Sequence, residues 1–169
     1  MRFSDHVAIV TGAGRGMGRC IAERLAAEGA KLIIAEIDPE TGRETARRIA
    51  EGGGEAFFVP TDVSSETSTR EMAAAAMAKY GAIHILVNNA AVFAGLELKT
   101  AEELPVAQWD RVMAVNLRGL FLATRAVLPQ MKQQRRGRSK DLLHLAILDE
   151  HDRFFGPAAD HLQKLDDLE

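Results

Sequence analysis

The pattern of hydrophobic and polar positions divides the chain into short apolar runs and longer amphipathic segments that alternate. Short apolar runs rich in β-branched residues predict buried strands at 7–10, 31–36, 55–59 and 84–89. Longer segments with apolar residues at helical spacing predict helices at about 17–28, 39–51, 66–80 and 108–132. Strands that alternate with helices in this way predict an α/β fold, a doubly wound parallel sheet with helices on both faces. Ligands of such sheets bind beyond the carboxyl ends of the strands.

The boundaries of the second predicted helix carry their own local signals. Asp38 precedes Pro39, which places a capping side chain before a proline suited to the first helical turn. The stretch "EGGGE" at 51–55 ends the helix, because glycine tolerates left-handed backbone angles. These signals support the alternation of elements.

The predicted helix at 108–132 has more apolar surface than a single core contact requires. One apolar stripe comprises Trp109, Val112, Met113, Leu117, Leu120, Phe121, Val127 and Met131. A second stripe comprises Val115, Gly119, Leu122 and Ala126. We expect the second stripe to meet another helix or another subunit, with Gly119 allowing close approach, and we predict a homo-oligomer formed through this helix.

Composition and charge narrow the class of protein. The chain of 169 residues is 47% hydrophobic and 27% charged, as expected of one globular domain. Its net charge of −3 gives no basis for a nucleic acid or an anionic membrane as partner. The N-terminus lacks a signal-peptide core, and no apolar stretch approaches the ~20 residues that span a bilayer. We predict a cytoplasmic protein whose single cysteine, Cys20, is a small buried hydrophobe.

The composition changes after a basic stretch at 132–140. Residues 1–138 carry 18 Lys and Arg against 16 Asp and Glu, whereas residues 139–169 carry 3 against 8. We therefore divide the chain into a domain at 1–138 and an acidic tail at 139–169. In that tail, 142–148 can form a strand or a helix, and 157–165 predicts a short helix. Its histidines, His144, His151 and His161, do not have the spacing of a zinc site, and we predict no metal.

The stretch "TGAGRGMGRC" at 11–20 has four glycines directly after the first predicted strand. Without Cβ atoms the backbone can approach a diphosphate, whose charge is met by unpaired N–H groups at the start of the next helix. The common G-x-G-x-x-G fingerprint is absent, and the spacing is instead T-G-x-x-x-G-x-G, formed by Thr11, Gly12, Gly16 and Gly18. A plain turn between a strand and a helix is the alternative.

This spacing resembles the cofactor motif of the short-chain dehydrogenase/reductase family. The resemblance implies a Rossmann-type, NAD(P)-binding domain over 1–138, here ending after four or five strands. It places Thr11, Gly12, Arg15, Gly16, Met17 and Gly18 at the cofactor.

Glu36 ends the second predicted strand and extends the resemblance. An acidic residue at this position would accept hydrogen bonds from the adenosine ribose and repel a 2′-phosphate, which favours NAD over NADP. Arg15 in the glycine turn favours a phosphorylated cofactor and so acts in the opposite sense. Asp38, the other nearby acid, is better explained as a helix cap.

Three further motifs follow in the order that the family has them. Asp62 and Val63 resemble its adenine-contacting pair, and a helix cap is the alternative for Asp62. Asn89 and Ala90, after Asn88, resemble the N-N-A-G element that lines the cofactor site, with alanine in place of glycine at position 91. Asn116 matches the helix asparagine of the family's proton relay and is the candidate catalytic residue; a structural asparagine is the alternative.

The resemblance stops near residue 138, before the family's catalytic residues. The family moves a proton through a tyrosine whose pKa is lowered by a lysine four positions later, since a free tyrosine titrates near ~10. The single tyrosine here, Tyr80, is followed by His84 at that distance, and Ser139 precedes the next strand candidate instead of ending it.

We therefore predict an NAD(H)-binding protein of the oxidoreductase type, acting on a small carbonyl or alcohol with weak or no activity. A non-catalytic dinucleotide-binding module and a fragment that needs a partner remain the alternatives.

Overall fold

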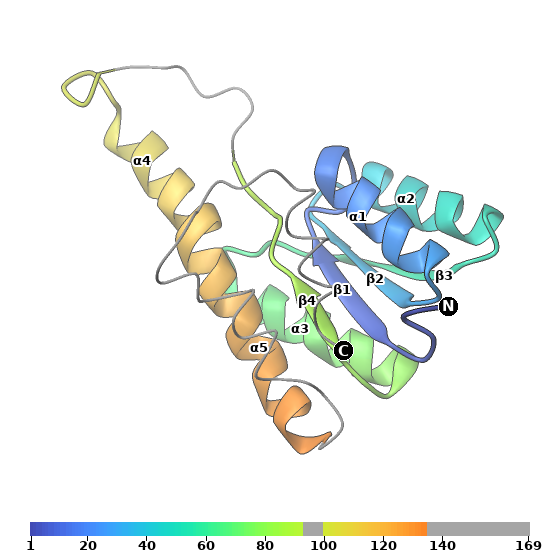
Figure 1. Ribbon diagram of the computed structural model, residues 1–169. Coiled ribbons are helices and arrows are strands. Elements are labelled where there is room, and N and C mark those ends of the chain that lie inside the picture. Colours follow the sequence, from blue (N-terminus) through green and yellow to red (C-terminus); the bar gives the residue numbers. More distant parts are fainter. Residues whose placement is uncertain (93–99, 135–169) are drawn as a thin grey trace.

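The computed structural model describes residues 1–92 and 100–134. Its strands are β1 (Val7–Thr11), β2 (Lys31–Glu36), β3 (Glu55–Pro60) and β4 (Ile85–Val87). Its helices are α1 (Gly16–Ala27), α2 (Pro39–Glu51), α3 (Glu66–Tyr80), α4 (Val106–Met113), the π-helix η1 (Ala114–Gly119) and α5 (Leu120–Gln133). The strands form one parallel sheet in the order β3-β2-β1-β4 (Figure 1). The predicted α/β alternation is confirmed.

Helices cover both faces of this sheet. Successive side chains of a strand point to opposite faces, so Ile9 packs in one apolar core with α3 and α5, whereas Ala8 and Val10 pack in the other with α1 and α2 (Figure 1). Ile33 and Ile34 of β2 divide in the same way, and both are fully buried. Burial on both faces explains why the strand sequences are apolar throughout.

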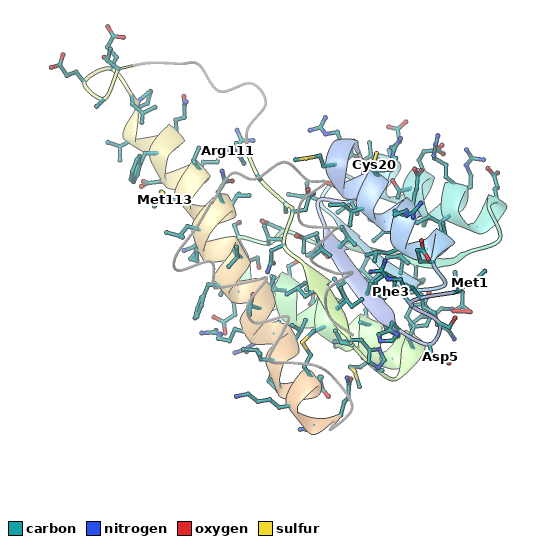
Figure 2. All side chains as sticks on the ribbon, in the orientation of Figure 1. Met1, Phe3, Asp5, Cys20, Arg111 and Met113 are labelled. Carbon is teal, nitrogen blue, oxygen red and sulfur yellow. The ribbon has the colours of Figure 1, made fainter. Side chains whose placement is uncertain are left out.

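Local signals in the sequence also give correct boundaries. The Asp38 side chain accepts a hydrogen bond from the Glu40 backbone N–H at 2.9 Å, so it caps α2 as predicted. The α2 helix ends at Glu51, and Gly53 follows with a φ of 81°. Cys20 departs from expectation, because its position near the start of α1 leaves it exposed instead of buried (Figure 2).

The predicted helix at 108–132 is a continuous helix from Val106 to Gln133 with the π-helical segment η1 in its middle. The second apolar stripe divides between two neighbours of the same chain. Leu122 is buried in the contact between α5 and α3, whereas a Cβ on Gly119 would lie 2.8 Å from Cγ2 of Val63, in the loop after β3. Gly119 therefore allows a loop, and not a helix, to approach closely.

The first apolar stripe is only partly buried. Val127 and Met131 lie in the core at 1% and 5% exposure, but Trp109, Leu117 and Phe121 are 53%, 58% and 53% exposed. The stripe thus leaves the core where α4 and η1 extend beyond the sheet (Figure 1). The exposed apolar side chains Val106, Trp109, Leu117 and Phe121 are called the exposed stripe below.

Among the described residues, Val106–Gln133 is a helix of 28 residues. It contains a stretch of 18 residues with a mean hydropathy of 1.3, so it is long and apolar enough to cross a bilayer. The expectation that no stretch approaches this length is therefore wrong. Length and composition do not show insertion into a membrane, because the core helix of a soluble protein can be equally long and apolar. Ala123 and Val127 of this helix lie in the protein core at 0% and 1% exposure.

Two histidines meet at the amino end of the sheet, on the side opposite the glycine turn. His84 Nδ1 accepts a hydrogen bond from the Val7 backbone N–H at 2.9 Å, and the His84 ring centre lies 5.2 Å from that of His6. Burial, followed by the proximity of His6, lowers the pKa of His84 below its usual range. The neutral ring is the form that joins β1 to the start of β4.

We expect acid to weaken this contact. The unfolded chain binds the proton of His84 more readily than the folded chain, so the free energy of unfolding should fall as the pH drops below ~6.5. Urea unfolding of the wild type and of His84→Asn at pH 7.5 and 5.5 measures the effect. The wild type should lose more stability than the variant over this interval, and an equal loss in both would contradict the assignment.

Candidate functional site

The carboxyl ends of β1, β2 and β4 meet at one edge of the sheet, where the glycine turn lies (Figure 1). Thr11 is the last residue of β1, Glu36 the last of β2, and Asn89 follows β4. These three sequence-predicted site residues thus come from three neighbouring strands. In open α/β sheets, ligands bind at this edge.

Close approach of backbone segments explains two of the motif glycines. A Cβ on Gly18 would overlap the carbonyl oxygen of Gly12 and the side chain of Asn89. Gly12 has a φ of 64°, and a Cβ there would lie 2.8 Å from Cα of Ala90. The start of α1 therefore packs directly on the ends of β1 and β4.

Gly16 is required for a different reason. Its φ of 56° is in the left-handed region, and no atom of the described residues lies within 4 Å of where its Cβ would be. Met17, the next residue, is 65% exposed, and Arg15 is exposed as well. The turn thus packs on the strand ends at Gly12 and Gly18, whereas its other side, at residues 15–17, is exposed. The first N–H groups of α1 lie there and have no partner within the helix.

Thr11 and Asn89 join the glycine turn to the end of β4. The Thr11 hydroxyl accepts hydrogen bonds from the backbone N–H groups of Asn89 at 3.0 Å and Ala90 at 3.1 Å, and donates to the Val87 carbonyl at 3.2 Å. In return, Asn89 Nδ2 donates to the carbonyls of Thr11 at 3.0 Å and Gly12 at 3.1 Å. These bonds hold Ala90 beside the turn.

Glu36 is 9% exposed and bound to backbone on both of its oxygens. Oε2 accepts from the Gly14 N–H at 2.9 Å, and Oε1 accepts from the N–H groups of Ile37 at 2.9 Å and Asp38 at 3.2 Å. Sequence reasoning assigned this carboxylate to a ribose and did not foresee that it holds the turn. An ionised carboxylate has about four acceptor positions, so three N–H donors leave capacity for a ligand hydroxyl.

Asp62 and Val63 follow β3 on the same side of the sheet. Asp62 Oδ1 accepts from the backbone N–H of Ser64 at 2.9 Å and from its hydroxyl at 2.7 Å, while Ser65 caps α3. Asp62 is thus not the helix cap that we weighed as the alternative. Val63 is 7% exposed and lies under Gly119 of η1.

Asn116 lies in the π-helix η1 and binds the segment after β4. Its Oδ1 accepts from the Val92 N–H at 2.8 Å, and its Nδ2 donates to the Val92 carbonyl at 3.1 Å. Single π-helical turns inside α-helices are frequent at functional sites. The structure places Asn116 against the chain that leads away from Asn89 and Ala90.

Tyr80 lies far from this edge. It ends α3 and packs on the apolar core, with Lys31 Nζ of the first β2 residue 5.9 Å from its ring centre, so it belongs to the amino end of the sheet. Burial, with a smaller effect of Glu55, raises the pKa of Tyr80 to about 12, away from the range that proton transfer needs. Its hydroxyl is buried and has no hydrogen-bond partner among the described residues.

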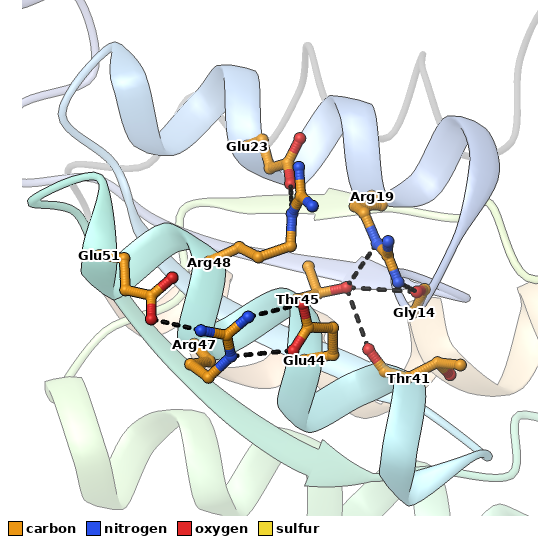
Figure 3. A network of polar contacts seen from close by, with 9 residues as sticks. All are labelled: Gly14, Arg19, Glu23, Thr41, Glu44, Thr45, Arg47, Arg48 and Glu51. Carbon is orange, nitrogen blue, oxygen red and sulfur yellow. Dashed lines mark hydrogen bonds and ion pairs between the residues drawn. The ribbon is translucent and has the colours of Figure 1, made fainter.

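Sequence reasoning missed several residues of the site. Arg19 and Thr45 both bond to the carbonyl oxygen of Gly14, from α1 and α2 respectively (Figure 3). Ile37 is 65% exposed beside Glu36. The signal in the sequence for Ile37 was an apolar residue between two acids directly after the strand, whereas nothing there distinguished Thr45. In the part of the chain that the structure describes, no group of His, Cys, Asp and Glu side chains could hold a metal ion.

Known proteins match this fold and this site. Residues 6–138 match the family described as short chain dehydrogenase, and the chain therefore belongs to that family. An uncharacterized oxidoreductase of Thermotoga maritima is 42% identical over 125 residues, which are 74% of this chain and 48% of that protein. A 2-(R)-hydroxypropyl-CoM dehydrogenase of Xanthobacter autotrophicus is 41% identical over 145 residues, 85% of this chain and 58% of that protein.

Solved structures agree. A 7α-hydroxysteroid dehydrogenase complexed with NADH and 7-oxo glycochenodeoxycholic acid superposes with a TM-score of 0.73 at 32% identity, over 79% of this chain and 51% of that one. A metagenomic short-chain oxidoreductase in complex with NADP has a TM-score of 0.73 at 37% identity, over 81% and 61%. The chain thus spans about half the length of the relatives it matches.

Proposed function

We propose that residues 1–138 form a domain that binds NAD(H), with Thr11, Gly12, Arg15, Gly16, Met17 and Gly18 around the diphosphate and Glu36 at the adenosine ribose. The observation that carries the proposal is the open side of the glycine turn, where bare backbone and the first N–H groups of α1 face outward. Asp62, Val63, Asn89 and Ala90 would complete the site at the ends of β3 and β4. The 7α-hydroxysteroid dehydrogenase of similar fold, which is 32% identical to this chain, is complexed with NADH.

The preference for NAD rests on charge. Glu36 is buried at the end of β2, where a cofactor 2′-phosphate would meet a carboxylate at close range. Arg15, exposed in the turn, is the group that would favour the phosphate. Another relative is complexed with NADP, so the affinities of this chain for both cofactors have to be compared.

Replacement of Glu36 by glutamine tests the preference. NADH should bind the wild type more tightly than NADPH does, and Glu36→Gln should raise the affinity for NADPH relative to NADH by about tenfold, since one repulsive charge is removed. Fluorescence titration with both cofactors measures the ratio. Asp38→Asn is the matched control, because Asp38 caps α2 and should leave the ratio unchanged. The absence of saturable NADH binding to the wild type would contradict the proposal itself.

We further propose that this chain by itself transfers hydride weakly or not at all, although its family is one of oxidoreductases. Tyr80, the single tyrosine of the sequence, lies at the amino end of the sheet with a raised pKa, and no lysine follows it at the family's spacing. Asn116 alone of the family's catalytic set is present, held by the Val92 backbone. A non-catalytic dinucleotide-binding module is the second candidate function, and it rests on the same observation.

Consumption of NADH in the presence of a panel of small ketones separates a working oxidoreductase from a chain with weak or no activity. The loss of a positioned acid–base group lowers rates by ~10²–10⁴-fold, so turnover should be near the buffer rate, and Tyr80→Phe should not change what remains. A wild-type rate of ~1 s⁻¹ or more, in the range of ordinary enzymes, would contradict this prediction.

The exposed stripe supports a homo-oligomer formed through the helix Val106–Gln133. Large apolar side chains on one helix face are a common mark of a protein–protein contact, and the stripe lies outside the core of this chain. A fragment that requires a different partner chain is the alternative use of the same surface.

Sedimentation velocity tests the oligomer. The wild type should sediment as a dimer or larger species, and Leu117→Glu should shift it toward monomer because a charge replaces an apolar contact. Gln133→Glu, which adds the same charge at the end of the same helix and outside the stripe, is the control. A wild type that is monomeric across the concentration range would overturn the proposal.

A further inference from the structure

A buried polar cluster lies beneath the glycine turn, between α1 and α2 (Figure 3). Thr45 of α2 is 0% exposed, and its hydroxyl lies 3.3 Å from the carbonyl oxygen of Gly14. Arg19 of α1 donates from Nε to the Thr45 hydroxyl at 3.1 Å and from Nη2 to the same Gly14 carbonyl. One carbonyl oxygen of the turn is therefore held by two side chains.

The Thr45 hydroxyl does more than fill space in a helix. A threonine inside a helix commonly bonds the carbonyl four residues earlier, and Thr45 Oγ1 does lie 3.1 Å from the Thr41 carbonyl. The single hydroxyl proton is shared between the Thr41 and Gly14 carbonyls, and one of the oxygen lone pairs accepts from Arg19 Nε. Valine would serve the packing equally well but would leave the Arg19 Nε without this acceptor.

The rest of the Gly14 peptide group is held as firmly as its carbonyl. The Gly14 N–H donates to Glu36 Oε2 at 2.9 Å. A Cβ on Gly14 would overlap Thr41 Oγ1 and would lie 2.8 Å from Glu36 Oε2. The residue is thus enclosed by α2 on one side and the end of β2 on the other, and both of its backbone polar groups are bonded.

The direction of the next N–H group follows from the planar peptide bond. In a trans peptide the carbonyl of one residue and the N–H of the next point in opposite directions. Because the Gly14 carbonyl points toward Arg19 and Thr45, the Arg15 N–H points away from them, to the open side of the turn. Gly16 and Met17 then begin α1 on that side.

We propose that Thr45 and Arg19 are positioning residues of the dinucleotide site. They hold the Gly14 carbonyl inward so that the backbone N–H groups at 15–17 face a cofactor diphosphate, and Thr45, being fully buried, does not touch the cofactor. The inference rests on the proposed binding of NAD(H) and adds to it two residues outside the glycine motif. Arg19 also carries a charge that attracts a diphosphate by itself, so the neutral Thr45 is the cleaner subject for a test.

Thr45→Val removes the hydroxyl at nearly constant volume, and Thr45→Ser restores it. We expect Thr45→Val to weaken the binding of ADP-ribose and NADH by about tenfold, which is ~1.4 kcal/mol, because the N–H groups at 15–17 are no longer held toward the diphosphate. Thr45→Ser should recover most of this affinity. Adenosine, which has no phosphate, should bind all three proteins alike. Thr69→Val is the matched control, because Thr69 is also 0% exposed and its hydroxyl donates within its own helix, to the Glu66 carbonyl at 3.0 Å.

Amide hydrogen exchange supplies a readout that needs no ligand. In the free protein, Thr45→Val should speed exchange of the Gly14 amide, which is bonded to Glu36, relative to the wild type, whereas Thr69→Val should not. If Thr45→Val does not fold, Arg19→Lys gives the same comparison, since lysine keeps the charge but lacks the planar fork that reaches two acceptors.

The outcomes separate the two proposals. A wild type that binds neither NADH nor ADP-ribose overturns the proposed function, and the positioning role at a cofactor with it. A wild type that binds both ligands, with Thr45→Val binding equally well and exchanging at the same rate, overturns the positioning role alone. Equal losses in Thr45→Val and Thr69→Val would assign the effect to general destabilisation and also overturn it.

Discussion

The architecture at the carboxyl edge depends on the contact between the start of α1 and the ends of β1 and β4. Gly18 lies against the carbonyl of Gly12 and the side chain of Asn89, at a distance that no Cβ would permit. Because α1 sits this close, the Asn89 amide reaches the carbonyls of Thr11 and Gly12 and joins two strands that are distant in sequence. The same contact aims the unpaired N–H groups of α1 at the open side of the turn.

Glu36 shows how one buried carboxylate can serve both structure and recognition. Three backbone N–H groups, one of them from Gly14, satisfy most of its acceptor capacity and offset the cost of burying its charge. An acid in this position secures the turn, and under the proposed function it would also present negative charge to the adenosine end of a dinucleotide. Opposite Glu36, Arg19 and Thr45 hold the Gly14 carbonyl, so that the turn is bonded on both sides of one residue.

The described residues include all the candidate cofactor-binding residues but leave a strand edge and an apolar helix face uncovered. Within the described residues β4 is an edge strand, and Trp109, Leu117 and Phe121 are exposed on the adjoining helix. The relatives are about twice as long as the portion matched here. These surfaces and the position of Tyr80 are the observations behind the proposal that this chain binds the cofactor without complete catalysis.

The amino-acid sequence by itself determined the elements whose causes are local. Short apolar runs predicted the four strands. Asp38 and Pro39 predicted the start of α2, and the spacing of Gly12, Gly16 and Gly18 predicted the turn. Each of these features depends on a few neighbouring residues. Family membership followed from the same motifs, and the match over residues 6–138 confirms it.

Tertiary structure decided what depends on residues far apart in the chain. The bonds of Glu36 to Gly14, the support of Gly14 by Thr45 and the packing of Gly119 on Val63 join positions separated by 22, 31 and more residues. Cys20 is exposed, although a cysteine in this context is usually buried, because α1 turns that face to solvent. No local pattern encodes such contacts, since they exist only once strands and helices have assembled in space.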